Sequence, residues 1–139
     1  MFKQSIKLVF SVWIMLFAAL CLARSAVPIE AVPDIEVRSL SGAPVEEAKV
    51  RKAILDAAAS QNWLVAPAGD GRIKATLHVR GKHTAVVAIT YDATKVTIKY
   101  QDSVDLKYGV ENGVQVIHPF YNKWVRALAD AIRIQLGKL

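Results

Sequence analysis

The sequence predicts an α+β fold in which an antiparallel β-meander of three to four strands carries one helix before it and one after it on the same face. The first observation is that residues 72–101 alternate between apolar and polar in three runs, which two short turn signals separate. The second is that residues 44–61 and 119–136 repeat their apolar positions with the period of an α-helix. Such elements bury their apolar sides against one another, so we expect a two-layer sandwich.

The N-terminus has the features of a secretory signal peptide. Lys3 and Lys7 precede an uncharged, mostly apolar run at 8–23, and Arg24 and small side chains follow it. A membrane-spanning helix needs about 20 apolar residues, so this run is short for a permanent anchor. We expect a signal peptide at 1–25, an extended lead-in or tether at 26–43 and a single α+β domain at 44–139. The protein would then be exported, to the periplasm or the outer membrane.

Cys21 is the only cysteine, and it decides between a lipoprotein and an exported protein without a thiol. Residues 18–21 resemble a bacterial lipobox, in which the cysteine is lipidated and becomes the first residue. Leu20 departs from the small residue that usually precedes that cysteine. Lipidation of Cys21, ordinary cleavage and retention as an uncleaved anchor therefore stay open. Membrane association is expected only with a lipidated Cys21 or an uncleaved signal.

The exported part is less basic than the whole chain. The full sequence has 18 basic and 12 acidic residues and a formal net charge of +6. Three of the basic residues lie before Ala26, which leaves a net charge of +3. This mild excess fits attraction to anionic components of the cell envelope, and we expect no nucleic-acid partner.

The lead-in and the first helix follow. Pro28 and Pro33 exclude a helix early in the lead-in. Residues 35–40 alternate strictly, which fits either a first edge strand or part of a tether. The helix predicted at 44–61 starts at Pro44, which suits a first helical turn.

A short strand is expected at 63–66 and a turn at 67–71, before the meander begins. On its strands, alternate residues face opposite sides of the sheet. The side away from the helices is expected to carry a basic face, made of Arg72, Lys74, Arg80, Lys95 and Lys99. This face is either the ordinary solvated side of a sheet or a site for an anionic glycan or lipid head group. Val86 and Ala88 lie among these charges and would be exposed unless another chain, the lead-in or a membrane covers them.

The regular pattern stops after Gln101 and returns with the helix at 119–136, which Gly137 ends. The Asn112-Gly113 pair between them predicts a small hairpin. A loop of this length in a small domain is often functional. The expected core is apolar and aromatic and includes Trp63, Leu77, Ile89, Ile98 and Trp124.

Common catalytic and metal-binding motifs are missing from the sequence. It has no phosphate-binding glycine loop, paired-cysteine motif, HExxH helix or GxSxG elbow, and we expect neither a metal nor another cofactor. His78 and His83 flank one turn, but no carboxylate stands beside them at ligand spacing, and zinc needs three or four protein ligands. Exposed strand and turn histidines are the simpler interpretation.

Two spaced patterns stand near the C-terminus. Tyr100, Ser103, Leu106 and Tyr108 form Y-x-x-S-x-x-L-x-Y, and residues 117–124 read I-H-x-x-Y-N-x-W. Together with the signal sequence, these patterns resemble a group of small exported proteins and lipoproteins of Gram-negative bacteria whose role is unknown. The resemblance covers most of the exported chain and implies an envelope location.

Four residues of these patterns form the candidate ligand site, namely Tyr108, His118, Tyr121 and Asn122. The alternative is structural. His118 would cap backbone N–H groups at the start of the helix, Asn122 would bond a neighbouring loop, and the two tyrosine hydroxyls would pin the long loop to the helix. Both interpretations use the same residue types, so the sequence leaves them open.

Three functions remain. The leading hypothesis is a non-enzymatic envelope protein, a binding or assembly accessory that contacts a partner protein or a second copy of itself through the sheet face or the lead-in. The second is a binder of an anionic glycan or lipid head group through the basic face. The third, a small hydrolase using His118 with Ser103 or Tyr121, is the weakest, because no third residue at a recognised spacing orients the histidine.

Overall fold

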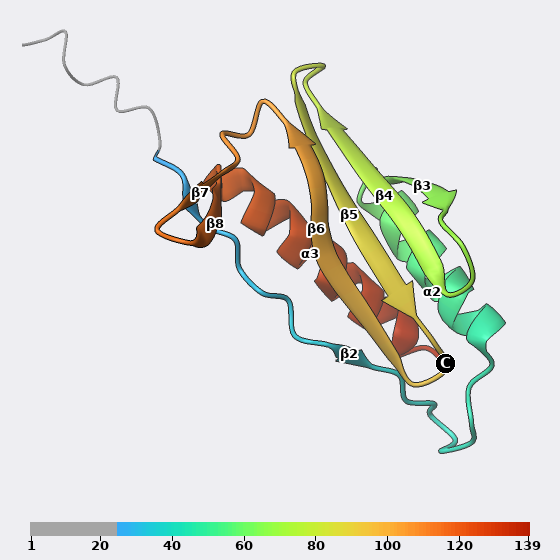
Figure 1. Ribbon diagram of the computed structural model, residues 1–139. Helices are drawn as coiled ribbons and strands as arrows, with labels where there is room; N and C mark the ends of the chain where they lie inside the picture. The colour runs from blue at the N-terminus through green and yellow to red at the C-terminus, as the bar shows by residue number, and fades with distance from the viewer. Residues whose placement is uncertain (1–24) are drawn as a thin grey trace, which may run out of the picture.

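The computed structural model describes residues 25–139 of the chain (Figure 1). Nearly all of the signal peptide expected at 1–25, including Cys21, lies outside the described residues. The described part forms two helices and two antiparallel sheets, one of five strands and one of three. The α+β class is therefore confirmed. Over the same residues, no helix is long and apolar enough to cross a membrane.

The larger sheet contains the predicted meander and one strand on either side of it. Its strands are β2 (Ile35–Glu36), β3 (Leu64–Pro67), β4 (Arg72–Val79), β5 (His83–Tyr91) and β6 (Lys95–Val104). Their order across the sheet is β2-β6-β5-β4-β3, and every neighbouring pair is antiparallel. β6 runs past the predicted end at Gln101, because a register shift beside Val86 and Val87 accommodates one extra residue in β6.

The smaller sheet lies beside the start of the second helix (Figure 1). It consists of β1 (Val27–Pro28), β7 (Gly109–Glu111) and β8 (Val114–Ile117), in the order β1-β8-β7. Asn112 and Gly113 turn the chain between β7 and β8 with φ values of 51° and 77°. These left-handed angles are those of a tight hairpin turn, so the predicted hairpin is confirmed.

The lead-in supplies one strand to each sheet, and the hairpin supplies β7 and β8, so the strands outnumber the three or four predicted. Val27 of β1 lies opposite Ile117 of β8, and Ile35 of β2 lies opposite Val96 of β6. Of the two alternatives for residues 35–40, the structure shows the edge strand, limited to Ile35–Glu36. The lead-in is thus attached to the domain at both ends.

The two helices are α2 (Glu47–Ser60) and α3 (Pro119–Leu136). α3 has the predicted bounds, whereas α2 begins three residues later than predicted. Glu46 caps α2 in an extended conformation, with φ −73° and ψ 137°, and Val45 before it packs against the core. An apolar residue just before the cap commonly fixes the direction in which the chain enters a helix.

Both helices pack behind the larger sheet and against each other (Figure 1). One core cluster joins apolar side chains of the inner sheet face with those of α2 and α3. Trp63, Leu77, Ile89 and Ile98 are buried as predicted, but Trp124 is only partly buried at the edge of the core. Among the described residues, the cluster spans positions 29–139, so we expect a chain that begins at Ala26 to fold by itself.

The outer face of the sheet corrects one expectation. Val86, predicted to be exposed there, is only 7% exposed. It lies in the central strand, opposite Thr76 on one side and Asp102 on the other, and side chains of neighbouring strands shield such a position. Ala88 is partly buried. Val86 and Ala88 therefore do not form an exposed apolar strip in the middle of the outer face.

Two isoleucines on α3 test this packing. Ile132 is fully buried and Ile134 is 63% exposed. Because Ile132→Ala leaves a cavity in the core, it should lower the free energy of unfolding by about 2–5 kcal/mol. Ile134→Ala should change it by less than about 0.5 kcal/mol. Urea unfolding of both variants gives the comparison, and equal losses would contradict the packing described.

Candidate functional site

Asn122 is a predicted site residue in which both polar atoms of the side chain make hydrogen bonds within the fold. Its side chain is 4% exposed. Its Nδ2 donates to the carbonyl oxygen of Pro28 and its Oδ1 accepts from the N–H of Glu30, both at 3.0 Å. The amide thus joins α3 to the lead-in, 92 and 94 residues away in sequence. This is the loop contact that the structural alternative anticipates.

His118 stands immediately before α3. Its Nδ1 accepts a hydrogen bond from the N–H of Phe120 at 3.1 Å, so it caps the helix as anticipated. Ser103, the proposed partner of His118 in a hydrolase, is bonded elsewhere: its Oγ lies 2.9 Å from the hydroxyl of Tyr100.

Three tyrosines form a cluster between β6, the hairpin and α3. Tyr108 stacks on Tyr100 with ring centres 4.6 Å apart, and Tyr121 meets Tyr100 edge-on at 5.6 Å. The hydroxyl of Tyr108 accepts from Gln115 of β8 at 3.0 Å, and so it holds the hairpin rather than the helix. The structure therefore brings Tyr108 and Tyr121 together and leaves His118 and Asn122 in separate surroundings.

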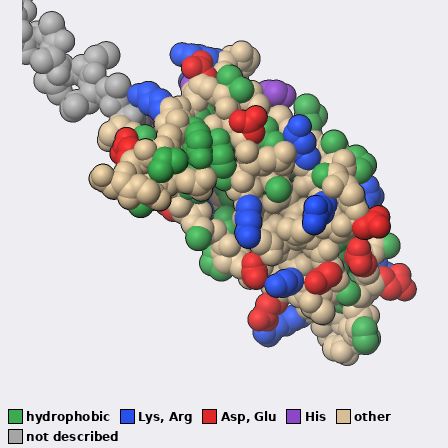
Figure 2. Space-filling model, in the orientation of Figure 1, with side chains coloured by type: hydrophobic (Ala, Val, Ile, Leu, Met, Phe, Trp, Pro, Cys, Tyr) green, Lys and Arg blue, Asp and Glu red, His purple; other side chains and the backbone are tan. Residues whose placement is uncertain are grey.

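The predicted basic face is only partly assembled. The strand registers place Arg72, Lys74, Lys95 and Lys99 on the outer side of the sheet, and Lys95 pairs with Asp34 at 3.7 Å. Figure 2 views this side and shows its cationic side chains scattered rather than gathered. Arg80 lies apart from them, in the turn after β4, because the turn bends it toward α3.

The two histidines of that turn point to opposite sides of the sheet. His78 Nδ1 lies 3.0 Å from the hydroxyl of Thr84, and His83 Nδ1 lies 2.7 Å from the carbonyl oxygen of Asp105. Nowhere in residues 25–139 do three or more His, Cys, Asp or Glu side chains gather where they could hold a metal ion.

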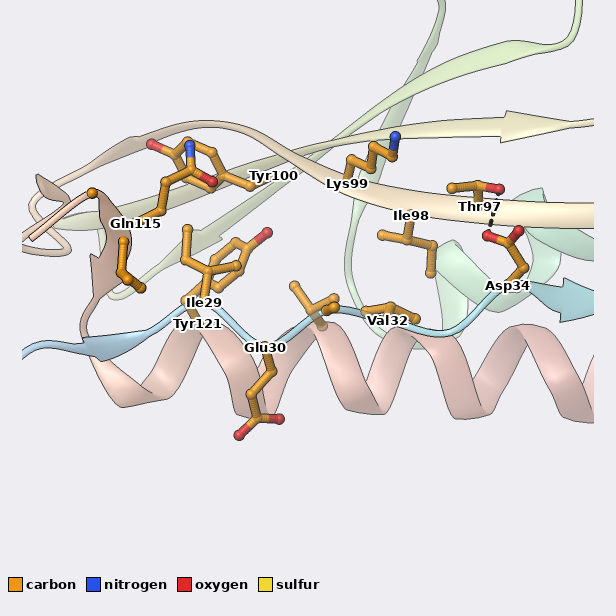
Figure 3. Close-up of a pocket in the computed structure, with 14 residues that line it drawn as sticks. Ile29, Glu30, Val32, Asp34, Thr97, Ile98, Lys99, Tyr100, Gln115 and Tyr121 are labelled. Carbon is orange, nitrogen blue, oxygen red and sulfur yellow. Dashed lines mark hydrogen bonds between the residues drawn. The ribbon is translucent and has the colours of Figure 1, made fainter. Parts of the chain in front are cut away.

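One hollow of the described structure is a groove that the sequence did not predict. It has a volume of about 680 Å³ and lies between β6 and residues 29–34 of the lead-in (Figure 3). Tyr121 and Val125 of α3 form its floor, and residues 113–115 of the hairpin close one end. At the other end, Asp34 accepts a hydrogen bond from the hydroxyl of Thr97 at 2.9 Å.

One edge of β6 is open along this groove. β2 pairs with β6 only at Lys95 and Val96. The N–H of Val37 donates to the carbonyl of Thr94 at 2.8 Å, and in an antiparallel pair such bonds recur at every second residue. The backbone N–H and C=O groups of Ile98 and Tyr100 therefore point toward the groove, and no described strand pairs with them.

Pro33 explains why the pairing stops. If the register of β2 and β6 continued, Pro33 would stand opposite Ile98. Proline has no backbone N–H, so it cannot donate to the carbonyl of Ile98. The lead-in instead leaves the sheet here, and Ile29 and Val32 pack against the core farther along.

The hydroxyl of Tyr121 is a second polar group that is open to the groove. The residue is 2% exposed, and its hydroxyl is directed between the lead-in and β6 (Figure 3). The hydroxyl makes no hydrogen bond to any described residue. Burial raises the pKa of the Tyr121 phenol, and the nearby Tyr100 adds to this rise, so the group stays a neutral donor and acceptor at physiological pH.

The proline of the lead-in indicated in the sequence that a strand ends there, but the position of the groove could not be predicted. Pro33 marks where an edge strand must end. Only the pairing of β2 with β6, about 60 residues apart, shows which backbone groups are left open.

The Asn122 contacts predict a clear effect on stability. Asn122→Ala leaves the carbonyl of Pro28 and the N–H of Glu30 without their partner, and should lower the free energy of unfolding by about 2 kcal/mol. The adjacent, exposed Lys123→Ala should change it by less than about 0.5 kcal/mol. Urea unfolding gives both values, and limited proteolysis should show faster cleavage of residues 26–34 in Asn122→Ala only. Equal stability and equal cleavage of the two variants would contradict this role of the Asn122 amide.

Burial of Tyr121 predicts a loss of stability in alkali. The pKa of the phenol is raised above 10.0 in the folded chain, so above about pH 10 the unfolded chain ionises Tyr121 before the folded chain does. The stabilisation is complete below that pH and declines as pH rises. Tyr121→Phe should reduce this decline, measured by urea unfolding at about pH 8 and pH 11. An unchanged decline would show that the phenol is not protected.

Comparisons with known proteins add no relative, since family models, curated proteins and solved structures all give no match to this chain.

Proposed function

We propose that this chain is a non-enzymatic exported protein of the cell envelope, and that it binds an extended segment of a partner protein along the open edge of β6. The observation that carries the proposal is the pair of unpaired backbone positions, Ile98 and Tyr100, facing a groove of about 680 Å³. An extended peptide satisfies such an edge by adding a strand, and pockets beside the edge select its side chains.

The dimensions support a peptide. Residues 97–100 line the groove, and four extended residues span about 13 Å at about 3.3 Å per residue. The lead-in forms the opposite wall, so an added segment would lie between the lead-in and β6. A groove of this size is within the range of ligand sites, about 300–1,000 Å³.

The lining suggests what the segment looks like. Side chains opposite Ile98 and Tyr100 would point to the inner side, where Tyr121 and Val125 form the floor. Those opposite Lys99 would point outward, where an acidic or polar residue suits the ammonium group. The segment would therefore alternate apolar with polar or acidic residues, and one inward residue would accept or donate a hydrogen bond at the Tyr121 hydroxyl.

The absence of an enzymatic role is supported by the engagement of the candidate catalytic groups. His118 Nδ1 caps α3, and Ser103 Oγ bonds Tyr100. These two bonds do not join His118 to Ser103, whereas nucleophilic catalysis needs a nucleophile hydrogen-bonded to its base.

Photo-crosslinking in the native envelope tests the proposal. A photoreactive phenylalanine analogue at Ala31 or Gln115, both on the groove, should cross-link a partner within a segment that alternates as described. The same analogue at Arg51, exposed on α2, should not give this product. Equal cross-linking from Arg51, or attachment within a helix of the partner, would overturn the proposal.

Amide hydrogen exchange supplies the backbone test. In the free protein, Ile98 and Tyr100 should exchange faster than Thr97 and Lys99, whose amides face β5. A synthetic peptide of the cross-linked segment should then protect Ile98 and Tyr100 and leave Thr97 and Lys99 unchanged. If Ile98 and Tyr100 stay unprotected in the complex, the segment does not bind as a strand on β6.

A further inference from the structure

A second hollow, of about 170 Å³, lies at the end of the molecule where the described chain begins. It is lined by Val79, Arg80, His83, Phe120, Lys123 and Trp124. The turn between β4 and β5 supplies one side and the start of α3 the other. Two cationic side chains thus lie beside two aromatic rings, and none of these four residues lines the β6 groove.

The fold builds this surface from a tight turn and the first turns of a helix. Arg80 and Gly81 turn the chain with left-handed φ values of 56° and 63°, and the N–H of Lys82 donates to the carbonyl of Val79 at 3.2 Å. On α3, the rings of Phe120 and Trp124 lie with centres 5.9 Å apart. Both rings are only partly buried, although the sequence predicted Trp124 in the core.

The charge of this surface is positive. Arg80, Lys82 and Lys123 are exposed, and within the described chain none of the three is in a salt bridge. The first turn of α3 has no acidic residue. An anionic partner would therefore meet unneutralised cations here.

The position of the surface identifies the partner. β1 runs antiparallel to β8 with Val27 opposite Ile117, so residues 25–26 pass the start of α3. The apolar run at 8–23 ends only two residues before Ser25. If that run, or a lipid on Cys21, were held in a membrane, the start of α3 would lie only a few residues of chain away from it.

We infer that Arg80, Lys82 and Lys123, together with Phe120 and Trp124, form a surface that binds an anionic phospholipid bilayer. The cations pair with lipid phosphates, and the two rings lie at the level of the head groups, where tryptophan is favoured. The bilayer is the occupant because the rings add an apolar contact that a dissolved anion does not use. The surface is separate from the β6 groove, so this inference and the proposed function can fail independently.

Vesicle binding of the chain that begins at Ala26 tests the inference without the apolar run. Vesicles of phosphatidylethanolamine and phosphatidylglycerol should bind this chain, and vesicles of phosphatidylcholine alone should bind it at least tenfold more weakly. Arg80→Glu with Lys123→Glu should reduce binding at least tenfold. Lys74→Glu with Lys99→Glu, on the outer face of the sheet, changes the net charge equally and should reduce it less than threefold.

Each contrary result has a meaning. Equal losses for the two double variants would show a nonspecific charge effect, and a larger loss for the Lys74 and Lys99 pair would assign binding to the sheet face. Either result overturns the inference, as does the absence of binding to anionic vesicles. Thermal unfolding confirms that each variant is folded. If Arg80→Glu disturbs the turn, Lys82→Glu with Lys123→Glu replaces it with the same expected loss.

Tryptophan fluorescence gives a measurement that does not depend on charge alone. The chain from Ala26 has two tryptophans, of which Trp63 is buried and Trp124 is partly exposed. Brominated lipids should quench the emission of Trp124, and Trp124→Phe should abolish the quenching. Persistent quenching in Trp124→Phe would place another surface at the membrane. Competition by inorganic phosphate beyond that of sodium chloride at equal ionic strength would indicate a site for a free anion and overturn the inference.

Discussion

The contact between the Asn122 amide and the backbone of the lead-in is the constraint on which the candidate site depends. The amide is buried and bonded to Pro28 and Glu30, so it fixes one wall of the groove to α3. At the far end of that wall, Asp34 bonds Thr97 and the pairing of β2 begins. The wall is thus held at both ends and stands away from β6 in between. Without the amide, residues 28–30 would lose these two hydrogen bonds to α3, and this wall of the groove would be held less firmly.

Much of the fold could be predicted because its signals are local. Alternation over residues 72–101 located β4, β5 and most of β6. The period of apolar residues, with Pro119 and Gly137 at the ends, gave the bounds of α3. The Asn112-Gly113 pair predicted the hairpin because few other residues adopt left-handed angles at such a turn. The predicted start of α2 was wrong. A proline and two acidic residues occur both just before a helix and in its first turn, so they did not show at which residue the helix begins.

The site was harder to predict because it depends on contacts between distant residues. Nothing near Ile98 in the sequence indicates that pairing with β2 stops at Val96, two residues earlier, since that depends on Pro33 in another segment. Arg80 reads as part of the alternating pattern of β4, yet the turn carries it to α3. Trp124 reads as core, since a large aromatic ring at a helical position is usually buried, but its place at the end of the sheet leaves it partly open. Asn122 and His118 were anticipated in their structural roles because those roles need only the helix and its neighbours.

The open edge of β6 has a consequence for self-association of the protein. An exposed sheet edge is a template on which copies of a protein join and aggregate. Here residues 29–34 of the lead-in stand opposite the open part of β6, so a second folded copy would have to displace them to pair with this edge. The proposed partner segment would instead lie between the lead-in and β6. Pro33, which ends the pairing of β2 with β6, would thus favour one added strand over self-association.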